Sequence, residues 1–495
     1  MRAGGILLPI FSLSGKYGIG CMSKKAYQFV DFLAASKQKY WQILPMGPTS
    51  FGDSPYQSYS TFAGNPYFIS LEDLIDQGLL REEECESIDF GENNQKIDYD
   101  KLYRNRIKLL RKAYVRSKIY KKNEFFLFKK ENEYWLRDYA LFMALKDWFG
   151  GGSFTEWPED IRKRYGYSMD HYQKTLYYEI EFHEYLQYEF YRQWFQLKKY
   201  ANEKGIQIIG DIPIYVAYDS ADVWARPELF QLDESGNMKA VAGCPPDGFS
   251  SKGQLWGNPL YDWDAHRASN FDWWIKRIEK CKDMYDMVRI DHFRGFDEYY
   301  SIPVTAEDAA GGHWEKGPGI DLFLAIRYCL GDVEIIAEDL GFITDSVKEL
   351  IRETGFPNMK VLEFAFDSRG SDGPAEYLPY NYEKNCVVYT GTHDNETLKG
   401  WIENIQKSGV GKISEYTGKE LEKDEIADEM LRLAISSTAN ICIIPIQDYM
   451  GLGDEARINT PSTLGNNWQW RMKEGQLTKK LAQKIGKYME IYGRV

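Results

Sequence analysis

Residues 287–295 read MVRIDHFRG, a short run of strand-forming residues that ends in charged side chains. A short and largely apolar run of this kind is typical of a strand buried on both faces of a parallel sheet. Arg289 and Asp291 stand two positions apart, and alternate residues of a strand point to the same face. The sequence therefore predicts a guanidinium and a carboxylate side by side at the end of this strand.

Seven other runs share this character and end in Gly, Pro, Asp or Glu or close to them, and helical patterns lie between them. Repeated strand–helix units of this kind build a parallel sheet. Eight such units predict a closed (β/α)8 barrel, a TIM barrel, rather than an open sheet. The eight predicted strands are 5–10, 40–45, 206–211, 287–291, 334–338, 360–364, 386–390 and 441–446.

Two intervals between these strands are too long for simple crossovers. Residues 51–170 are predicted to form a mainly helical insertion between the second and third strands. Residues 215–282 are rich in Gly, Pro, Trp and Asp and predict a loop-rich insertion between the third and fourth strands. Residues 1–495 are then one barrel domain with two insertions at the C-terminal rim of the barrel.

The composition limits the possible partners. The formal charge is −13, from 61 Lys and Arg against 74 Asp and Glu, so the chain repels nucleic acids and anionic membranes. Seven scattered cysteines without a CxxC pair are typical of reduced thiols in a cytosol. The apolar patch at the N-terminus is too short for a signal peptide or a membrane span. We expect a cytoplasmic protein without nucleic-acid or membrane partners.

Polar side chains stand where several of the predicted strands end. The third strand ends at Asp211 and the fifth at Glu338, and the seventh leads into His393 and Asp394. Active sites of TIM barrels lie at this end of the strands. Carboxylates that converge there are costly to bury unless they are paired, and His292 and His393 are expected hydrogen-bond donors. The pattern predicts an active site.

The residue types favour cleavage of a glycosidic bond with retention of configuration. That chemistry needs one ionised carboxylate as nucleophile and one protonated carboxyl group as acid. The Arg289 guanidinium would lower the pKa of Asp291 and keep it ionised, so Asp291 is the predicted nucleophile. Glu338 is the predicted acid/base, and Asp394 is predicted to bind sugar hydroxyls and to stabilise positive charge in the transition state.

Simpler interpretations exist for each residue taken alone. An Asp after a strand is often the N-cap of the next helix, and Arg289 with Asp291 could be a structural ion pair. Carboxylates with histidines also occur in metal-dependent hydrolases, but the six histidines include no HxH or HxxxH pair. We therefore expect no metal. The sequence also has no GxSxG elbow and no GxxxxGK[ST] phosphate loop.

Longer motifs around these residues are VRIDHFRGF at 288–296, AEDLG at 337–341 and YTGTHDNET at 389–397. They resemble the strand-end motifs of the amylomaltases, 4-α-glucanotransferases within the α-amylase superfamily. The similarity extends from GGILLPI at 4–10 to GNNWQWR at 465–471. Most α-amylases carry an Asn-His pair near the third strand end, whereas Asp211 leads into IPIYVAYD, as in amylomaltases. The residues after 446 are too few for the C-terminal β-sandwich domain of most α-amylases.

By this resemblance, Asp291 corresponds to the nucleophile, Glu338 to the acid/base and Asp394 to the third carboxylate. Tyr56 resembles an aromatic platform on the donor side, with Ser54 beside it. The segment GCPPDGFSSKGQLWGNP at 243–259 resembles a mobile loop over the cleft. The implied sugar-contacting residues are Arg289, His393, Asp211, Tyr56, Ser54, Asp247, Phe249, Gln254, Trp256, Asp367 and Asn459.

The resemblance implies a double displacement that moves a segment of an α-1,4-glucan to the 4-hydroxyl of another sugar. It implies α-1,4-glucans and maltooligosaccharides as partners, no cofactor, and a monomer or weak homo-oligomer. There are two alternatives. One is an α-1,4-glucan hydrolase that uses the same three carboxylates with water as acceptor. The other is a catalytically inactive glucan-binding protein, which predicts that one of the three carboxylates is replaced, whereas all three are present.

Overall fold

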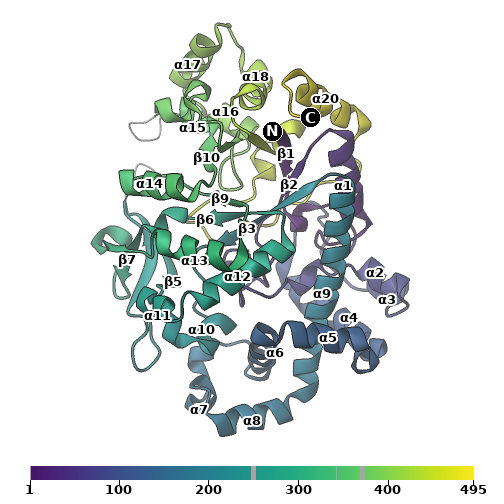
Figure 1. The fold of residues 1–495 in the computed structure, drawn as a ribbon. Coiled ribbons are helices and arrows are strands. Elements are labelled where there is room, and N and C mark those ends of the chain that lie inside the picture. The colour runs from purple at the N-terminus through teal and green to yellow at the C-terminus, as the bar shows by residue number, and fades with distance from the viewer. Residues whose placement is uncertain (1, 247–251, 342, 368–373) are drawn as a thin grey trace.

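The computed structural model describes residues 2–246, 252–341, 343–367 and 374–495. Eight parallel strands close into a barrel, and each strand lies beside its neighbours in chain order (Figure 1). This confirms the predicted (β/α)8 architecture. The barrel strands are β1 Ala3–Leu7, β2 Tyr40–Gln42, β3 Gln207–Pro213, β6 Met287–Asp291, β9 Ile335–Ala337, β10 Asn358–Val361, β11 Cys386–Tyr389 and β12 Ile441–Pro445.

The strand boundaries agree with the prediction for β6 and differ most at the first and sixth strands. The first strand ends at Leu7, and Ile10–Ser12 form a 3-10 turn. The sixth strand ends at Val361, and α15 Leu362–Phe366 follows at once. Leu362 and Phe366 are four residues apart and both buried, so this apolar run has helical rather than strand spacing.

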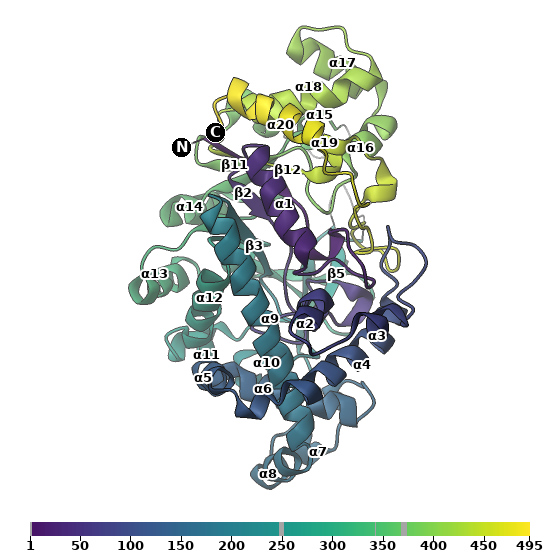
Figure 2. The same cartoon turned by 90° about the vertical axis from the view of Figure 1, so that its right-hand side faces the viewer.

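Helices surround the barrel on the outside. Figure 2 shows α1 and the long α9 running side by side along one flank. α17 Lys407–Thr417 packs against α15, and α19 Ile446–Met450 follows β12 directly. The outer helices are α1 Lys24–Ala35, α9 Tyr177–Glu203, α12 Asp272–Met284, α13 Ile320–Leu330, α14 Asp345–Thr354, α16 Leu398–Asn404, α18 Lys423–Ser436 and α20 Lys479–Ile491.

The two ends of the chain meet at the closure of the barrel. β1 pairs with β12 in parallel, with Ala3 opposite Ile441. Arg494 Nη1 donates to the Ala3 carbonyl at 3.2 Å, and Arg2 Nη1 donates to the Tyr492 carbonyl at 2.7 Å. The N- and C-termini therefore lie together, at the opposite end of the molecule from α7 and α8 (Figure 1).

Residues 51–170 carry seven helices, and those of the second half of this segment extend away from the barrel (Figures 1 and 2). α6 packs against α9, and this contact joins the extension to the outer layer of the barrel. The helices are α2 Leu71–Asp76, α3 Glu82–Glu86, α4 Tyr99–Ser117, α5 Asn123–Glu131, α6 Glu133–Trp148, α7 Glu159–Arg162 and α8 Gly166–Thr175.

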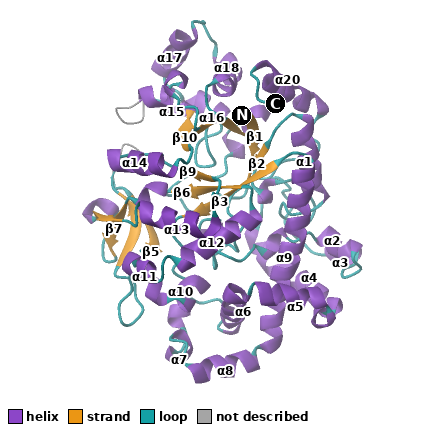
Figure 3. Ribbon diagram, viewed as in Figure 1, coloured by secondary structure: helices purple, strands orange, loops and turns teal. Residues whose placement is uncertain are grey.

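Residues 215–282 contain more regular structure than the predicted loops. They form α10 Ala221–Ala225, β4 Ala240–Cys244, β5 Gln254–Pro259, α11 Trp263–Ala268 and α12. β4 and β5 join β7 Glu298–Pro303 and β8 His313–Lys316, from the next connection, in an antiparallel sheet of order β5-β4-β7-β8. Figure 3 shows this sheet beside the barrel. The sequence prediction missed it because its central pair, β4 with β7, joins strands more than forty residues apart in the chain.

The inside of the barrel is apolar below a polar layer. Ile209 and Asp211 lie on the same face of β3, so the apolar cluster leads directly to the charged strand ends. Tyr389 donates from its hydroxyl to Gln42 Oε1 at 2.8 Å within this interior. The buried apolar cluster comprises Leu7, Ile209, Ile336, Met359, Val387, Tyr389, Ile441 and Ile443. No helix in the described ranges is long and apolar enough to cross a membrane.

We predict that Gly5→Ala destabilises the barrel at its closure. A Cβ at residue 5 would lie 2.5 Å from the Ile443 side chain and 2.8 Å from the Tyr40 carbonyl oxygen. Overpacking of this kind costs about 1–3 kcal/mol. Gly411→Ala in α17 is the control, because nothing lies within 4 Å of the added Cβ. The midpoint of urea unfolding should be lower than that of the wild type for Gly5→Ala and should not be lowered for Gly411→Ala. Equal midpoints for the two variants would contradict the packing argument.

Candidate active site

The charged strand ends meet around Arg289, which is almost fully buried in β6. Asp211 lies directly opposite Arg289 in the register between β3 and β6. Arg289 Nη1 donates to both oxygens of Asp211, at 2.8 and 2.9 Å, and Nη2 donates to Asp291 Oδ1 at 2.8 Å. One guanidinium thus binds two carboxylates from neighbouring strands, as the spacing of Arg289 and Asp291 predicts.

Burial and charge act in opposite directions in this group. Burial works against the charge of Arg289, but the carboxylates of Asp211 and Asp291 raise its pKa above the ordinary value. Burial raises the pKa of Asp211, and the Arg289 guanidinium opposes this. Asp211 is 0% exposed, whereas the Asp291 side chain is 32% exposed. Asp291 is the carboxylate of this pair that a substrate can reach.

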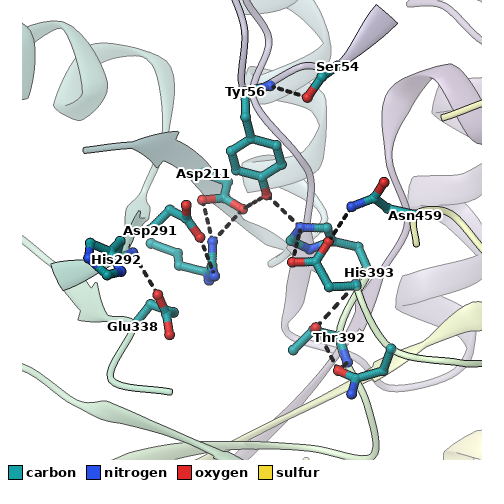
Figure 4. A network of polar contacts seen from close by, with 12 residues as sticks. Ser54, Tyr56, Asp211, Asp291, His292, Glu338, Thr392, His393 and Asn459 are labelled. Carbon is teal, nitrogen blue, oxygen red and sulfur yellow. Dashed lines mark hydrogen bonds and ion pairs between the residues drawn. The ribbon is translucent and has the colours of Figure 1, made fainter. Parts of the chain in front are cut away.

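Glu338 follows β9 and is buried close to Asp291. Its Oε2 accepts the His292 backbone N–H at 2.6 Å (Figure 4), and its Oε1 accepts the Leu340 backbone N–H at 2.6 Å. Burial raises the pKa of Glu338 to about 8, and the nearby charge of Asp291 adds to the increase, while Arg289 opposes it. Glu338 is therefore mostly protonated at neutral pH.

His292 contacts both Glu338 and Trp256, a residue of β5. Its backbone has φ 53°, a left-handed conformation that is uncommon outside glycine and that directs its N–H toward Glu338. Its ring meets the Trp256 ring edge to face at 4.7 Å, and Trp256 Nε1 donates to Gln254 Oε1 at 3.0 Å. Burial lowers the pKa of His292 to about 3, so the ring is neutral.

Tyr56 and His393 form the other side of the site. The Tyr56 hydroxyl donates to Asp211 Oδ2 at 2.7 Å and lies 2.9 Å from His393 Nε2 (Figure 4). Because the hydroxyl has a single proton, His393 Nε2 must be the donor in the second contact. The two rings are stacked, with centroids 5.3 Å apart. Asp394 Oδ2 lies 3.4 Å from the same nitrogen.

Asp394 is held by residues that follow the eighth strand. Asn459 Nδ2 donates to Asp394 Oδ1 at 2.7 Å, and Arg457 Nη2 donates to the Asp394 carbonyl at 2.9 Å. Trp468 lies against Tyr56 and His393, with ring centroids 5.8 and 6.0 Å away. The sequence prediction named Asn459 as a sugar contact and missed Arg457 and Trp468, although Trp468 lies in the GNNWQWR motif.

Four predicted sugar contacts remain, of which the structure describes Ser54 and Asp367. The Ser54 hydroxyl accepts the Tyr56 backbone N–H at 3.3 Å, in the turn that carries the tyrosine. Asp367 ends α15, and Trp401 Nε1 donates to its Oδ2 at 3.4 Å. Asp247 and Phe249 lie outside the described residues. Asp339 faces the neighbouring strand, where its Oδ1 accepts the Met359 backbone N–H at 2.9 Å.

Within the ranges that the structure describes, no group of three or more His, Cys, Asp and Glu could hold a metal ion. The network around Arg289 is instead an arrangement of ion pairs and hydrogen bonds. It offers one accessible carboxyl group paired with a guanidinium, one protonated carboxyl group, and a third carboxyl group beside a histidine. Retaining glycoside chemistry uses a pair of carboxyl groups, and the first two can supply it.

The family model described as 4-α-glucanotransferase matches residues 8–478. The chain belongs to the 4-α-glucanotransferase family. The 4-α-glucanotransferase of Clostridium butyricum is 49% identical, over 98% of this chain and 100% of its own length. That of Thermus thermophilus is 44% identical, over 96% of each chain.

A solved structure agrees with this. The amylomaltase from Streptococcus agalactiae, determined in complex with acarbose, has a TM-score of 0.96 and 43% identity, and 100% of both chains is covered. The protein is an enzyme with 4-α-glucanotransferase activity on α-1,4-glucans. This decides in favour of transfer over the two alternatives, hydrolysis and binding without catalysis.

We predict that Glu338 makes the stability of the fold depend on pH. Its pKa is 4.5 in an unstructured chain and about 8 in the fold. Between these values the folded state keeps a proton that the unfolded state releases. The contribution of Glu338 to the free energy of unfolding is therefore fully present below pH 4.5 and is lost as the pH rises through 8. Relative to Glu338→Gln, the wild type should lose about 1 kcal/mol of unfolding free energy per pH unit across this window.

Urea unfolding of both proteins between pH 4 and 9 measures this difference. The test is the slope of the difference in unfolding free energy with pH. The absolute difference is not used, because the amide of the variant changes the two hydrogen bonds of the Glu338 carboxyl group. The surface variant Glu92→Gln is the control and should differ from the wild type by a pH-independent amount. A flat difference for Glu338→Gln as well would show that Glu338 is ionised in the fold at neutral pH.

Proposed function

We propose that the enzyme transfers glucan segments by a retaining double displacement, in which Asp291 is the nucleophile and Glu338 the acid/base. The observation that carries this is the contrast between the two side chains. The Asp291 side chain is 32% exposed and is paired with Arg289, whereas Glu338 is buried and protonated at neutral pH. Carboxyl groups in such different environments are suited to different roles.

In the first half-reaction, an Asp291 oxygen attacks the anomeric carbon of the donor glucan. The bond from that carbon to the leaving oxygen breaks, and its electron pair stays on the oxygen. Glu338 gives its proton to this oxygen, so the leaving glucan departs as a neutral alcohol. The products are a glycosyl ester on Asp291 and an ionised Glu338.

In the second half-reaction, the 4-hydroxyl of an acceptor sugar replaces the leaving glucan. Ionised Glu338 removes the hydroxyl proton as the oxygen attacks the anomeric carbon, and the ester bond to Asp291 breaks. Asp291 is again a carboxylate and Glu338 is again protonated, so both return to their starting states. One α-1,4 bond is broken and one is made, and the chemistry of these groups requires no cofactor.

Asp394 is proposed to stabilise the positive charge that develops on the sugar ring. Its carboxylate is 42% exposed and is oriented by Asn459 and by His393. Tyr56 is proposed as a platform for the donor sugar, because its ring is fixed by His393, on which it stacks, and by contact with Trp468. Aromatic rings of this kind present an apolar face to the C–H groups of a sugar.

The remaining sugar contacts are proposals of the same kind. His292 and Trp256 stand next to Glu338, where the leaving glucan and the acceptor must pass, and Gln254 fixes the indole. Asp211 and Arg289 are buried and act mainly on the groups around them. The proposal also keeps, from the resemblance, Asp247 and Phe249 in the loop over the cleft, Ser54 beside Tyr56, and Asp367.

We expect Glu338→Gln to trap the glycosyl-enzyme. With an α-maltotriosyl fluoride donor the leaving fluoride needs no proton, so Asp291 can still attack, but the second half-reaction lacks its base. Intact-protein mass spectrometry should then show an adduct of one maltotriosyl group, and peptide mapping should place it on Asp291.

Asp291→Asn is the matched variant and should give no adduct with the same donor. With maltotriose as substrate, both variants should lose at least about 10³-fold in kcat, since each lacks a group that acts in the chemical step. Normal transfer by Asp291→Asn would remove the proposed nucleophile.

The protonation of Glu338 should also set the alkaline limit of activity. The pKa of about 8 predicts that kcat/KM for maltotriose falls as the pH rises through that value, because the first step needs the acid form. With the fluoride donor, the fall near pH 8 should disappear. An alkaline limb near pH 5 with maltotriose would mean that Glu338 is not the acid.

A further inference from the structure

One carboxylate outside the site ties the two ends of the loop that carries His393 and Asp394. Asp448 lies in α19, directly after β12. Its Oδ2 accepts the Thr390 hydroxyl at 2.5 Å, and its Oδ1 accepts the Leu398 backbone N–H at 2.9 Å. Thr390 follows the end of β11 and Leu398 is the first residue of α16. The residues on either side of the seven-residue segment 391–397 are therefore hydrogen-bonded to the same carboxylate.

Water does not compete for these hydrogen bonds. Asp448 is 5% exposed, Thr390 0% and Leu398 1%. The Leu398 N–H belongs to the first turn of α16, where no helical acceptor is available, and a negative charge is favourable at that end of a helix. Removing the carboxylate would leave a buried donor without a partner.

Burial raises the pKa of Asp448 to about 6, and the hydrogen bonds from Thr390 and Leu398 oppose the increase. The carboxylate is therefore ionised near neutral pH. α16 and α19 lie together near the C-terminal strands (Figure 2), so the carboxylate and the loop belong to packed elements.

The loop between these ends is organised around its own side chains. Asn395 Oδ1 accepts both the Thr392 backbone N–H and the Thr392 hydroxyl at 2.8 Å. A second carboxylate supports the end of the loop, since Asp454 Oδ1 accepts the Thr397 backbone N–H at 3.0 Å. Because the turn is hydrogen-bonded internally, its two ends help to set where His393 and Asp394 lie, together with Asn459 and Arg457.

We propose that Asp448 is a positioning residue for the transfer reaction, which holds Asp394 and His393 in place by fixing both ends of residues 391–397. This rests on the proposed role of Asp394. Asp448 itself lies behind the loop and makes its contacts to Thr390 and Leu398, not to the groups around Arg289. Its effect on the chemistry passes through the loop.

The test compares kcat and KM for maltotriose in Asp448→Ala and Asp448→Asn, with thermal unfolding of each. Displacement of a catalytic group by about 1 Å can cost about 100-fold in rate. We expect Asp448→Ala to lower kcat about 10- to 100-fold with KM within about threefold, because Asp394 acts in the transition state. Asp448→Asn should stay within about threefold of the wild-type kcat, since its amide can accept from Leu398 and donate to Thr390.

Asp286→Ala is the matched control at the other end of the barrel. Asp286 Oδ2 accepts the Ile208 backbone N–H at 2.7 Å and Asn202 Nδ2 at 2.9 Å, so it also ties a strand to a neighbouring segment. Its loss should lower the unfolding temperature and leave kcat unchanged. If Asp448→Ala fails to fold, Thr390→Val removes one of the two bonds at similar volume and should lower kcat several-fold.

The outcomes separate this inference from the proposed function. A lower unfolding temperature with unchanged kcat in Asp448→Ala, or in Thr390→Val where it replaces that variant, would overturn the positioning role. An equal loss of kcat in Asp286→Ala would do the same. Asp394→Asn is measured alongside. If this variant keeps the wild-type kcat, the role proposed for Asp394 fails. If Asp394→Asn is inactive while Asp448→Ala is fully active, only the positioning role of Asp448 is refuted.

Discussion

The buried ion pair of Arg289 with Asp211 is the interaction on which the site depends. Burying either charge alone would be costly, and together they are tolerated because two donor–acceptor contacts join them on adjacent strands. The second nitrogen of the guanidinium then reaches outward to Asp291. The barrel interior thereby supplies the positive charge of Arg289 to Asp291, while the Asp291 side chain stays accessible to a substrate.

The same barrel gives two carboxyl groups on neighbouring strands opposite environments. Asp291 shares a guanidinium and faces the open side of the site. Glu338 is enclosed by the backbone turn of His292 and Leu340, which supplies N–H groups but no full charge. Burial is the largest effect on the pKa of Glu338, so the protonation of Glu338 at neutral pH arises from its removal from solvent.

The barrel and the residues at its strand ends could be predicted because both depend on local pattern. Short apolar runs mark parallel strands, and alternation places Arg289 and Asp291 on one face. Those rules do not reach Arg457 and Trp468, which come from beyond the eighth strand and meet Asp394 and Tyr56 only in the folded chain.

The antiparallel sheet was missed for a related reason. β4 and β7 are paired in the sheet but are separated in the chain by β5, two helices and a barrel strand. No turn motif in the sequence therefore indicates that these two strands pair. The run 360–364 is only partly a strand, because β10 ends at Val361 and α15 begins at Leu362. A run this short does not show from its own pattern where a strand gives way to a helical turn. The degree of burial that sets the pKa of Glu338 is likewise a property of the assembled site.

The pairing of β1 with β12 also governs when this protein can begin to work during its synthesis. β1 leaves the ribosome long before β12, one of its two neighbours, because more than four hundred residues separate Leu7 from Ile441. The segments that hold Asp394 emerge later still. A nascent chain thus carries Asp291 and Glu338 before the barrel around them can close, and glucan remodelling starts only after β12, Arg457 and Asn459 have been made.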